Sequence, residues 1–271
     1  MKSDKLWAAA LLSCMLLIGC GGGHGNSGPN FRADRSLAQG LYDGTIVYDD
    51  GPEQLRFNQQ TVVLETGEFF IVYGNTYDTV FLLDGFLHGT GQISDTSFDF
   101  YSYDLNDYFF QDDDNTIDAV YNGRLTASFS PGEFFNGSTE QADSTADFTG
   151  TVPRVAIYDY NAAATLTSVA GDWNMVDLLG NSLTVSVSGL DGSFAGIYPN
   201  ACSFSGSLTP RASGKNVFNM TISFGPTPCP QPSQSFSGIA YDYAPSPLAR
   251  TLVMAGVTVD GSQGTTLFGI R

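Results

Sequence analysis

Side chains able to carry catalysis are few in this chain. It has two histidines, His24 and His88, and His24 lies in a glycine-rich stretch that cannot fix its position. A Ser-His-Asp triad would have to use His88, but no Gly-x-Ser-x-Gly motif accompanies it. There is also no phosphate-binding loop. These features favour a non-enzymatic protein. A hydrolase using two carboxylates stays open, because acids are plentiful and nothing selects one pair.

The densest polar clusters are two acidic runs, over residues 104–107 and 112–118. Calcium prefers several carboxylate and carbonyl oxygens within one loop. The second run has loosely the spacing of a calcium loop. However, Ile117 stands where the sharp turn requires glycine, and Gly123 stands where a bidentate glutamate is required. We therefore predict a solvated acidic loop and no metal site.

Aromatic side chains accompany the acidic runs. On a strand, Phe98 and Phe100 share one face, while Tyr101 and Tyr103 share the other. If the phenylalanines fill a core, the tyrosines are exposed beside the acids, where they suit a basic protein or peptide partner. The alternative is that loops or the other half of the chain cover both faces. The predicted binding residues are Tyr101, Tyr103, Asp104, Asp107, Tyr108, Asp112, Asp113 and Asp114.

The charge balance limits the classes of partner. The formal net charge is −17, from 28 acidic and 11 basic residues. Nucleic acid and anionic lipid headgroups repel such a chain, so we expect neither as a partner. Cations, cationic peptides and basic protein surfaces are the favoured electrostatic partners. The same acidity also serves a simpler purpose, which is to keep an exported domain soluble.

The N-terminus has the layout of an export signal. Two lysines precede an apolar run over residues 6–18, which is too short to span a bilayer as a permanent helix. The run ends in Leu17-Ile18-Gly19-Cys20, which resembles the lipobox of bacterial lipoproteins. The resemblance implies cleavage before Cys20 and diacylation of its thiol. Gly21 follows, where aspartate would resemble an inner-membrane retention signal, so we expect the outer membrane. An ordinary secretory peptide with a chance cysteine is the alternative.

The remaining cysteines are expected to pair. Cys14 and Cys20 belong to the signal, which leaves Cys202 and Cys229 in an exported, oxidising compartment. An isolated pair in such a compartment most simply forms one disulfide. No Cys-x-x-Cys spacing and no neighbouring histidine indicates a metal or redox role for the pair.

Strand patterns dominate the rest of the chain. Residues 183–188 and 218–224 alternate apolar and polar side chains, and the only helix expected is a short one near residues 162–169. Asp-Gly and Asn-Gly pairs supply the positive φ angles of tight turns. The pattern predicts an all-β fold of antiparallel barrel or sandwich modules. The pairs expected to form turns include Asp43-Gly44, Asp84-Gly85, Asn122-Gly123, Asp191-Gly192 and Asp260-Gly261.

A weak internal duplication indicates two tandem modules. Gly40-Leu41-Tyr42-Asp43 opens the first half and Gly171-Asp172-Trp173-Asn174 opens the second, with later motifs following in the same order. Each half is long enough for about eight short strands around its own core. The predicted segments are a signal peptide (1–19), a lipidated cysteine with a glycine-rich tether (20–36), an N-terminal β module (37–153), a linker (154–167) and a C-terminal β-barrel module (168–271).

This layout resembles a known group of proteins. A lipobox, a glycine tether and two β-barrel-like modules look like the factor H-binding and transferrin-binding surface lipoproteins of Gram-negative bacteria. The second half, with Trp173 and the segments 192–194 and 201–206, is similar to uncharacterised proteobacterial lipoproteins. No ligand residue of the named binders carries over, because no specific motif aligns. The ending over residues 267–271 also lacks their C-terminal glycine-rich signature.

The sequence therefore predicts a lipid-anchored, non-enzymatic cell-envelope protein with a binding or structural role, no cofactor and no nucleic-acid partner. Two alternatives stay open, a carboxylate-dependent hydrolase and a lipocalin-like carrier of a small apolar ligand. A closed barrel filled with side chains would exclude the carrier. Two carboxylates about 5–10 Å apart in a cleft would favour the hydrolase.

The anchor can be tested directly. In a Gram-negative host, Cys20→Ala is expected to abolish incorporation of labelled palmitate, because the lipid is attached through this thiol. Cys14→Ala, within the discarded segment, is the matched control and should keep the label. Label that persists in Cys20→Ala would contradict the anchor, and recovery of the labelled protein with inner-membrane vesicles would contradict the sorting.

Overall fold

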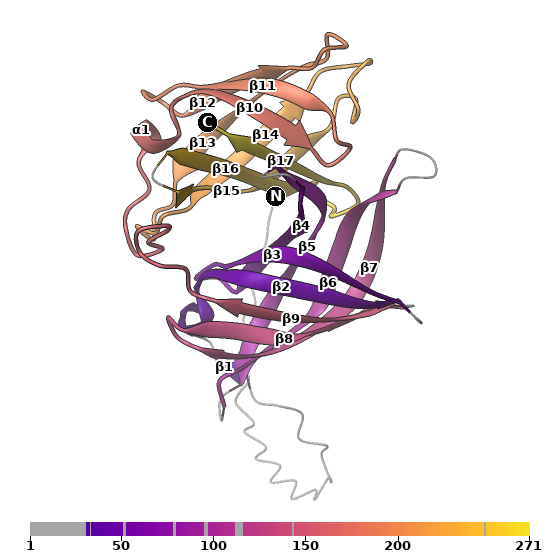
Figure 1. Ribbon diagram of the computed structural model, residues 1–271, viewed down its shortest axis with the longest axis vertical. Coiled ribbons are helices and arrows are strands. Elements are labelled where there is room, and N and C mark those ends of the chain that lie inside the picture. The colour runs from indigo at the N-terminus through magenta and orange to yellow at the C-terminus, as the bar shows by residue number, and fades with distance from the viewer. Residues whose placement is uncertain are drawn as a thin grey trace, which may run out of the picture.

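The computed structural model describes most of the chain beyond the N-terminal segment. It is an all-β fold of two closed, eight-stranded antiparallel barrels in tandem, as predicted (Figure 1). Among the described residues, no helix combines the length and the apolar character needed to cross a membrane. The described residues are 31–32, 34–50, 53–77, 80–94, 97–111, 116–142, 144–246 and 248–271.

The first barrel is an up-and-down meander in which each strand pairs with its sequence neighbours and the last strand closes on the first. A two-stranded extension, β1 (Phe31–Arg32), pairs with the end of β5, and the 3-10 helix η1 (Arg35–Ala38) precedes β2. β1 and the first two residues of η1 lie within residues 20–36, the range predicted as the tether. The barrel strands are β2 (Gly40–Asp50), β3 (Glu53–Val63), β4 (Glu68–Tyr77), β5 (Val80–Ser94), β6 (Asp99–Gln111), β7 (Thr116–Ser130), β8 (Phe134–Glu140) and β9 (Thr145–Thr151).

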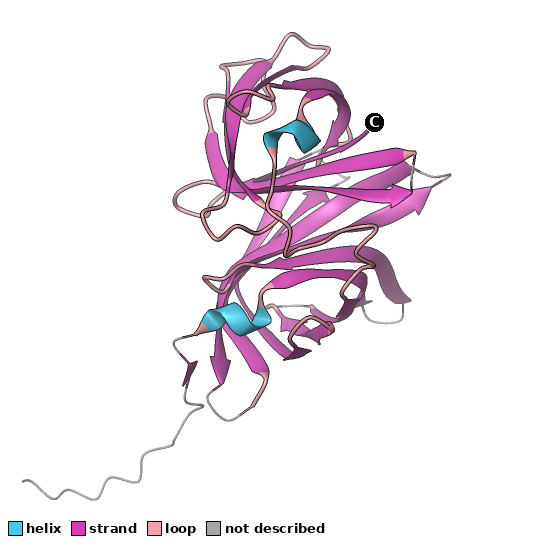
Figure 2. Cartoon of the chain, turned by 90° about the vertical axis from the view of Figure 1, so that its left-hand side faces the viewer, coloured by secondary structure: helices cyan, strands magenta, loops and turns pink. Residues whose placement is uncertain are grey.

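The second barrel repeats this topology. The helix α1 (Leu166–Val169) precedes it, within the range expected for a helix, and Figure 2 shows one short helix beside each barrel. Its strands are β10 (Gly171–Asp177), β11 (Ser182–Val187), β12 (Ser193–Ile197), β13 (Ser203–Pro210), β14 (Phe218–Phe224), β15 (Ser235–Ser246), β16 (Ala249–Val257) and β17 (Gly264–Ile270).

Apolar side chains fill the interior of the second barrel. Strands β11 and β14 alternate buried and exposed residues along their whole length, as their sequence pattern predicted. Trp173 is fully buried and donates a hydrogen bond from Nε1 to the carbonyl of Val169, which joins α1 to the core. The predicted disulfide between Cys202 and Cys229 is confirmed, with Cα atoms 4.6 Å apart. It ties the start of β13 to the loop after β14.

Of the five Asp-Gly and Asn-Gly pairs predicted to form turns, three lie inside strands. Asp191-Gly192 and Asp260-Gly261 do form turns. Asp43-Gly44 lies within β2, where a Cβ on Gly44 would stand 1.8 Å from the carbonyl oxygen of Thr149, so glycine permits close backbone approach. The other two pairs mark β-bulges. The register shifts at Asp84 on β5 and near Asn122 on β7, where Asn122 takes a φ of 61°.

The two barrels share an apolar core between their outer faces. Strand β4 is buried on both sides: Phe69 and Ile71 point into the barrel, while Phe70 and Val72 point out toward the second barrel. Strands β16 and β17 are likewise buried along most of their length. The residues of this inter-barrel cluster are Leu41, Val62, Leu64, Phe70, Val72, Leu83, Phe86, Tyr108, Tyr158, Tyr160, Leu178, Val217, Ile239, Tyr241, Val253, Ala255 and Phe268.

Polar contacts complete the inter-barrel junction. Arg211 of the second barrel pairs with Glu65 of the first at 2.7 Å, and the hydroxyl of Tyr241 donates to Gln60 Oε1 at 3.0 Å. The connecting segment also takes part, because the hydroxyl of Tyr160 donates to the carbonyl of Val63. At Gly264 a Cβ would stand 2.6 Å from the rings of Phe86 and Tyr108, so glycine lets these rings lie against the backbone of β17.

The shared cluster should make the barrels unfold together. Phe70→Ala is expected to lower the free energy of unfolding by about 3–5 kcal/mol, because it removes a fully buried ring from the cluster. Trp173 lies inside the other barrel. Urea unfolding monitored by Trp173 fluorescence should therefore report the full decrease in the free energy of unfolding. Leu55→Ala, at a residue 45% exposed, is the control and should shift stability by less than about 0.5 kcal/mol. An unchanged Trp173 transition in Phe70→Ala would mean that the barrels unfold independently.

Candidate functional site

Asp107 lies inside the first barrel. It is 3% exposed, although it belongs to a strand whose pattern indicated an outward position. From Phe100 to Ser102 the even-numbered residues of β6 point inward. The pairing with β7 then shifts between Ser102 and Leu105, which inserts one extra residue into β6. This bulge reverses the alternation, so that Leu105 and Asp107 point inward.

Two tyrosines hold the carboxylate of Asp107. The hydroxyl of Tyr73 on β4 donates to Oδ1 at 2.9 Å, and the hydroxyl of Tyr48 on β2 donates to Oδ2 at 3.1 Å. The rings of Tyr48, Tyr73 and Phe57 lie together, with centroids 5.5 to 6.0 Å apart. Both carboxylate oxygens are thus fixed by donors whose own rings are packed against each other.

Burial sets the protonation state of this group. Removal from water raises the pKa of Asp107 to about 7, even though the hydrogen bonds from Tyr73 and Tyr48 oppose the shift. The same burial and the nearby carboxylate raise the pKa values of Tyr48 and Tyr73 well above 10, so both phenols stay protonated donors. Near neutral pH, Asp107 therefore exchanges readily between acid and carboxylate.

A cavity of about 420 Å³ opens above these side chains at the mouth of the first barrel. Its volume falls in the range of small-molecule sites. The other end of the barrel is closed by packed rings, among them Phe100, Phe135 and Phe148, and by Leu37 of η1. The residues that line the mouth cavity are Tyr48, Asp49, Leu55, Phe57, Tyr73, Asp84, Asp107, Phe109, Phe110, Val120, Gln141 and Ser144.

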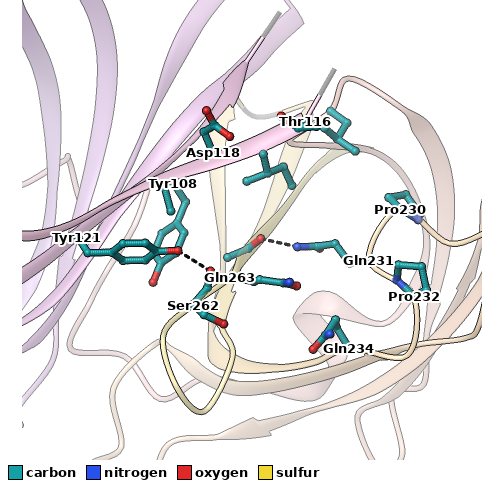
Figure 3. Close-up of a pocket in the computed structure, with 14 residues that line it drawn as sticks. Tyr108, Thr116, Asp118, Tyr121, Pro230, Gln231, Pro232, Gln234, Ser262 and Gln263 are labelled. Atoms are coloured by element: carbon teal, nitrogen blue, oxygen red, sulfur yellow. Dashed lines mark hydrogen bonds between the residues drawn. The ribbon is translucent and has the colours of Figure 1, made fainter. Parts of the chain in front are cut away.

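A second cleft, of about 520 Å³, lies between the barrels (Figure 3). Tyr121 of β7 donates a hydrogen bond to the carbonyl of Ser262 at 2.7 Å, and Tyr108 donates to the carbonyl of Gly261 at 2.6 Å. Gln231 donates to the carbonyl of Gly264 at 2.9 Å. The two tyrosine bonds fix a loop of the second barrel to the wall of the first, while the Gln231 bond lies within the second barrel. We interpret this cleft as the rim of the inter-barrel junction.

The structure does not bring the predicted binding residues onto one surface. Tyr103 is 58% exposed and Tyr101 is half-buried, as expected for an outer face. Asp107, however, is inside the barrel, and Tyr108 is buried in the inter-barrel cluster, so neither can contact a protein partner at the outer surface. The reason is the bulge in β6, which sends successive parts of the strand to different faces. The predicted residues Asp112, Asp113 and Asp114 lie outside the described residues.

The remaining candidates have local roles. Asp104 is exposed and accepts hydrogen bonds from the backbone amide of Thr90 at 2.8 Å and from the hydroxyl of Ser102 at 2.7 Å. His88 lies within β5, where its ring packs on Phe70 and its Nε2 stands 3.2 Å from Glu68 Oε1. Within the part of the chain that the structure describes, no three His, Cys, Asp or Glu side chains gather as a metal site would require.

Sequence reasoning missed the tyrosines that build the site. Tyr73 continues the inward face of Phe69 and Ile71, and this period of two is readable in the sequence. Its partnership with Asp107 is not readable, because it depends on the β6 bulge and on the closure of the barrel.

Comparisons with solved structures give distant likenesses. No family model matches the chain, and no curated protein matches it. A protein of unknown function from Nostoc punctiforme, of the DUF3598 family, is 11% identical over 88% of this chain and 98% of that one, with a TM-score of 0.25. A transferrin binding protein B mutant from Haemophilus parasuis is 9% identical over 89% of this chain and 76% of that one, with a TM-score of 0.23. At these scores the likenesses carry no argument about function.

Burial of Asp107 should make stability depend on pH. Its folded pKa of about 7 exceeds the ordinary value of 3.8, so the folded state holds the proton longer than the unfolded state. Stability is therefore lost as pH rises from about 4 to 7. As pH rises through this window, the free energy of unfolding of Asp107→Asn, measured with urea, is expected to increase by about 2–4 kcal/mol relative to that of the natural protein. Asp118→Asn, at an exposed position, is the control. A difference between Asp107→Asn and the natural protein that does not vary with pH would contradict the assignment.

Proposed function

We propose that the protein is a lipid-anchored, non-enzymatic binding protein of the cell envelope that holds a small ligand in the mouth of its first barrel. The observation that carries this proposal is the mouth cavity itself. It combines apolar and aromatic walls, from Leu55, Phe57 and Val120 among others, with a few convergent polar groups and a buried acid of raised pKa. This combination is typical of ligand sites.

The arrangement of Asp107 suits binding better than covalent catalysis. Both of its oxygens accept hydrogen bonds from tyrosines that stay protonated, which restrains the carboxylate as a nucleophile. The hydrolase alternative would need a second carboxylate acting with it. Asp49 and Asp84 also line the cavity. Turnover of a ligand by the protein would therefore favour that alternative over the present proposal.

The second barrel supports the first in this proposal. Its interior is filled by a continuous cluster that includes Trp173, Phe204 and Phe236, which leaves the carrier role to the first barrel. The disulfide and the inter-barrel cluster make it a firm base. Tyr101, Tyr103 and Asp104 on the outer face of β6 remain predicted contacts for a basic protein partner.

The proposed anchor is compatible with an open cavity. The chain enters the first barrel through β1, which pairs with Ile93 and Ser94 at one end of β5. The mouth cavity lies around Asp84, toward the other end of the same strand. About nine residues of strand separate these points, or roughly 30 Å. The described chain thus enters at the closed end of the barrel, away from the mouth.

Nile red, a neutral fluorescent probe, tests for the site. We expect it to bind the chain that begins at residue 20 and carries Cys20→Ala, a change that keeps lipid from competing for the dye. Val120→Trp, which fills the mouth cavity, should weaken binding at least about tenfold. Gln263→Trp fills the cleft between the barrels instead and is the matched control. Equal binding by Val120→Trp and the natural cavity, with the folded state verified by circular dichroism, would contradict the proposed site.

A further inference from the structure

The charge of the mouth cavity restricts the ligand that it can hold. Three carboxylates, those of Asp49, Asp84 and Asp107, line it, and none of its described lining residues is Lys, Arg or His. Arg56 lies between the lining residues Leu55 and Phe57 in the sequence, but its side chain is exposed. It donates a hydrogen bond to Thr45 Oγ1 at 3.3 Å. An anionic ligand would therefore meet like charges, of which that of Asp107 is itself buried.

Aromatic rings stand where a cation would be attracted. Tyr48, Phe57 and Tyr73 surround the approach to Asp107, with ring centroids 5.5 to 6.0 Å from each other. The electron-rich faces of such rings attract ammonium groups, most strongly where water is excluded. Leu55, Phe109 and Val120 add an apolar wall for the remainder of a ligand.

We propose that the ligand class of this cavity is a small amphiphilic organic cation, whose protonated amine pairs with Asp107 between the aromatic rings and whose apolar part fills the barrel mouth. The assignment rests on the proposed function and names its ligand chemistry. Asp107 is buried and has only neutral hydrogen-bond donors as partners among the contacts described for it, so a bound ammonium supplies the missing positive charge.

The proposal predicts how pH acts on binding. Tyr48 of β2, Tyr73 of β4, Asp84 of β5 and Gln141 after β8 face the cavity around Asp107, and Asp49 lies at its rim. An alkyl ammonium has a pKa near that of lysine, about 10.4, and stays charged between pH 5.5 and 8.5. Within that interval a change in affinity therefore reports the ionisation of the protein's carboxylates. The ionised form of Asp107 is the form that binds the cation.

Three ligands that differ only in their head group test the assignment: 1-octylamine, 1-octanol and octanoate, each displacing Nile red from the same chain. At pH 8.5 octylamine should bind at least about tenfold more tightly than octanol, and octanoate more weakly than octanol. Lowering the pH to 5.5 should reduce the affinity for octylamine about tenfold or more and leave that for octanol unchanged.

The matched variants separate this inference from the proposed function. In Asp107→Asn the affinity for octylamine should fall to that for octanol, while Nile red still binds. Asp118→Asn should keep the tighter binding of octylamine. Nile red binding without a preference for octylamine would overturn the cation assignment alone. Failure of Nile red to bind the natural cavity would overturn the proposed function. Should Asp107→Asn not fold, the three ligands and the pH series on the natural chain still decide the assignment.

Discussion

Packing between the outer faces of the two barrels is the interaction on which the rest of this structure depends. A small barrel usually hides apolar side chains inside and presents polar ones to water. Here apolar side chains stand on the outer faces of β4 and β5 and of β15 to β17, where each barrel is covered by the other. Direct contacts such as that between the rings of Phe81 and Phe268, with centroids 4.8 Å apart, join the two sheets. Either barrel alone would expose a large apolar patch, which soluble proteins avoid.

The same packing fixes the walls of the mouth cavity. Tyr73 points into the first barrel, while Val72 beside it on β4 points into the inter-barrel cluster. The strand that carries a donor to Asp107 is therefore held on both faces. Asp84 on the neighbouring strand reaches the cavity at a bulge, and Phe86 two residues later is locked between the barrels. A site whose supporting strands are this restrained loses little freedom when a ligand binds.

The overall plan of the molecule was readable from the sequence, but the site was not. Alternating patterns such as residues 218–224 indicate a strand with one buried face directly, and an isolated pair of cysteines indicates a disulfide. Residues 69–73 of β4 and most of β16 form runs without alternation, which indicates burial on both faces without identifying the partner. Asp107 was misplaced because one extra residue in β6 reverses which side chains face inward, and local sequence carries no sign of that shift.

Asp107 also shows how a binding site can oppose stability. A carboxylate buried with neutral donors is a costly feature, and hydrophobic packing of similar volume would stabilise the barrel more. The rest of the first barrel follows local rules closely, with rings such as Phe100, Phe135 and Phe148 filling its closed end. Departures from such consistency are expected at functional positions. A ligand that brings a positive charge to Asp107 would remove the penalty of its ionisation, so binding and stability would be linked through one side chain.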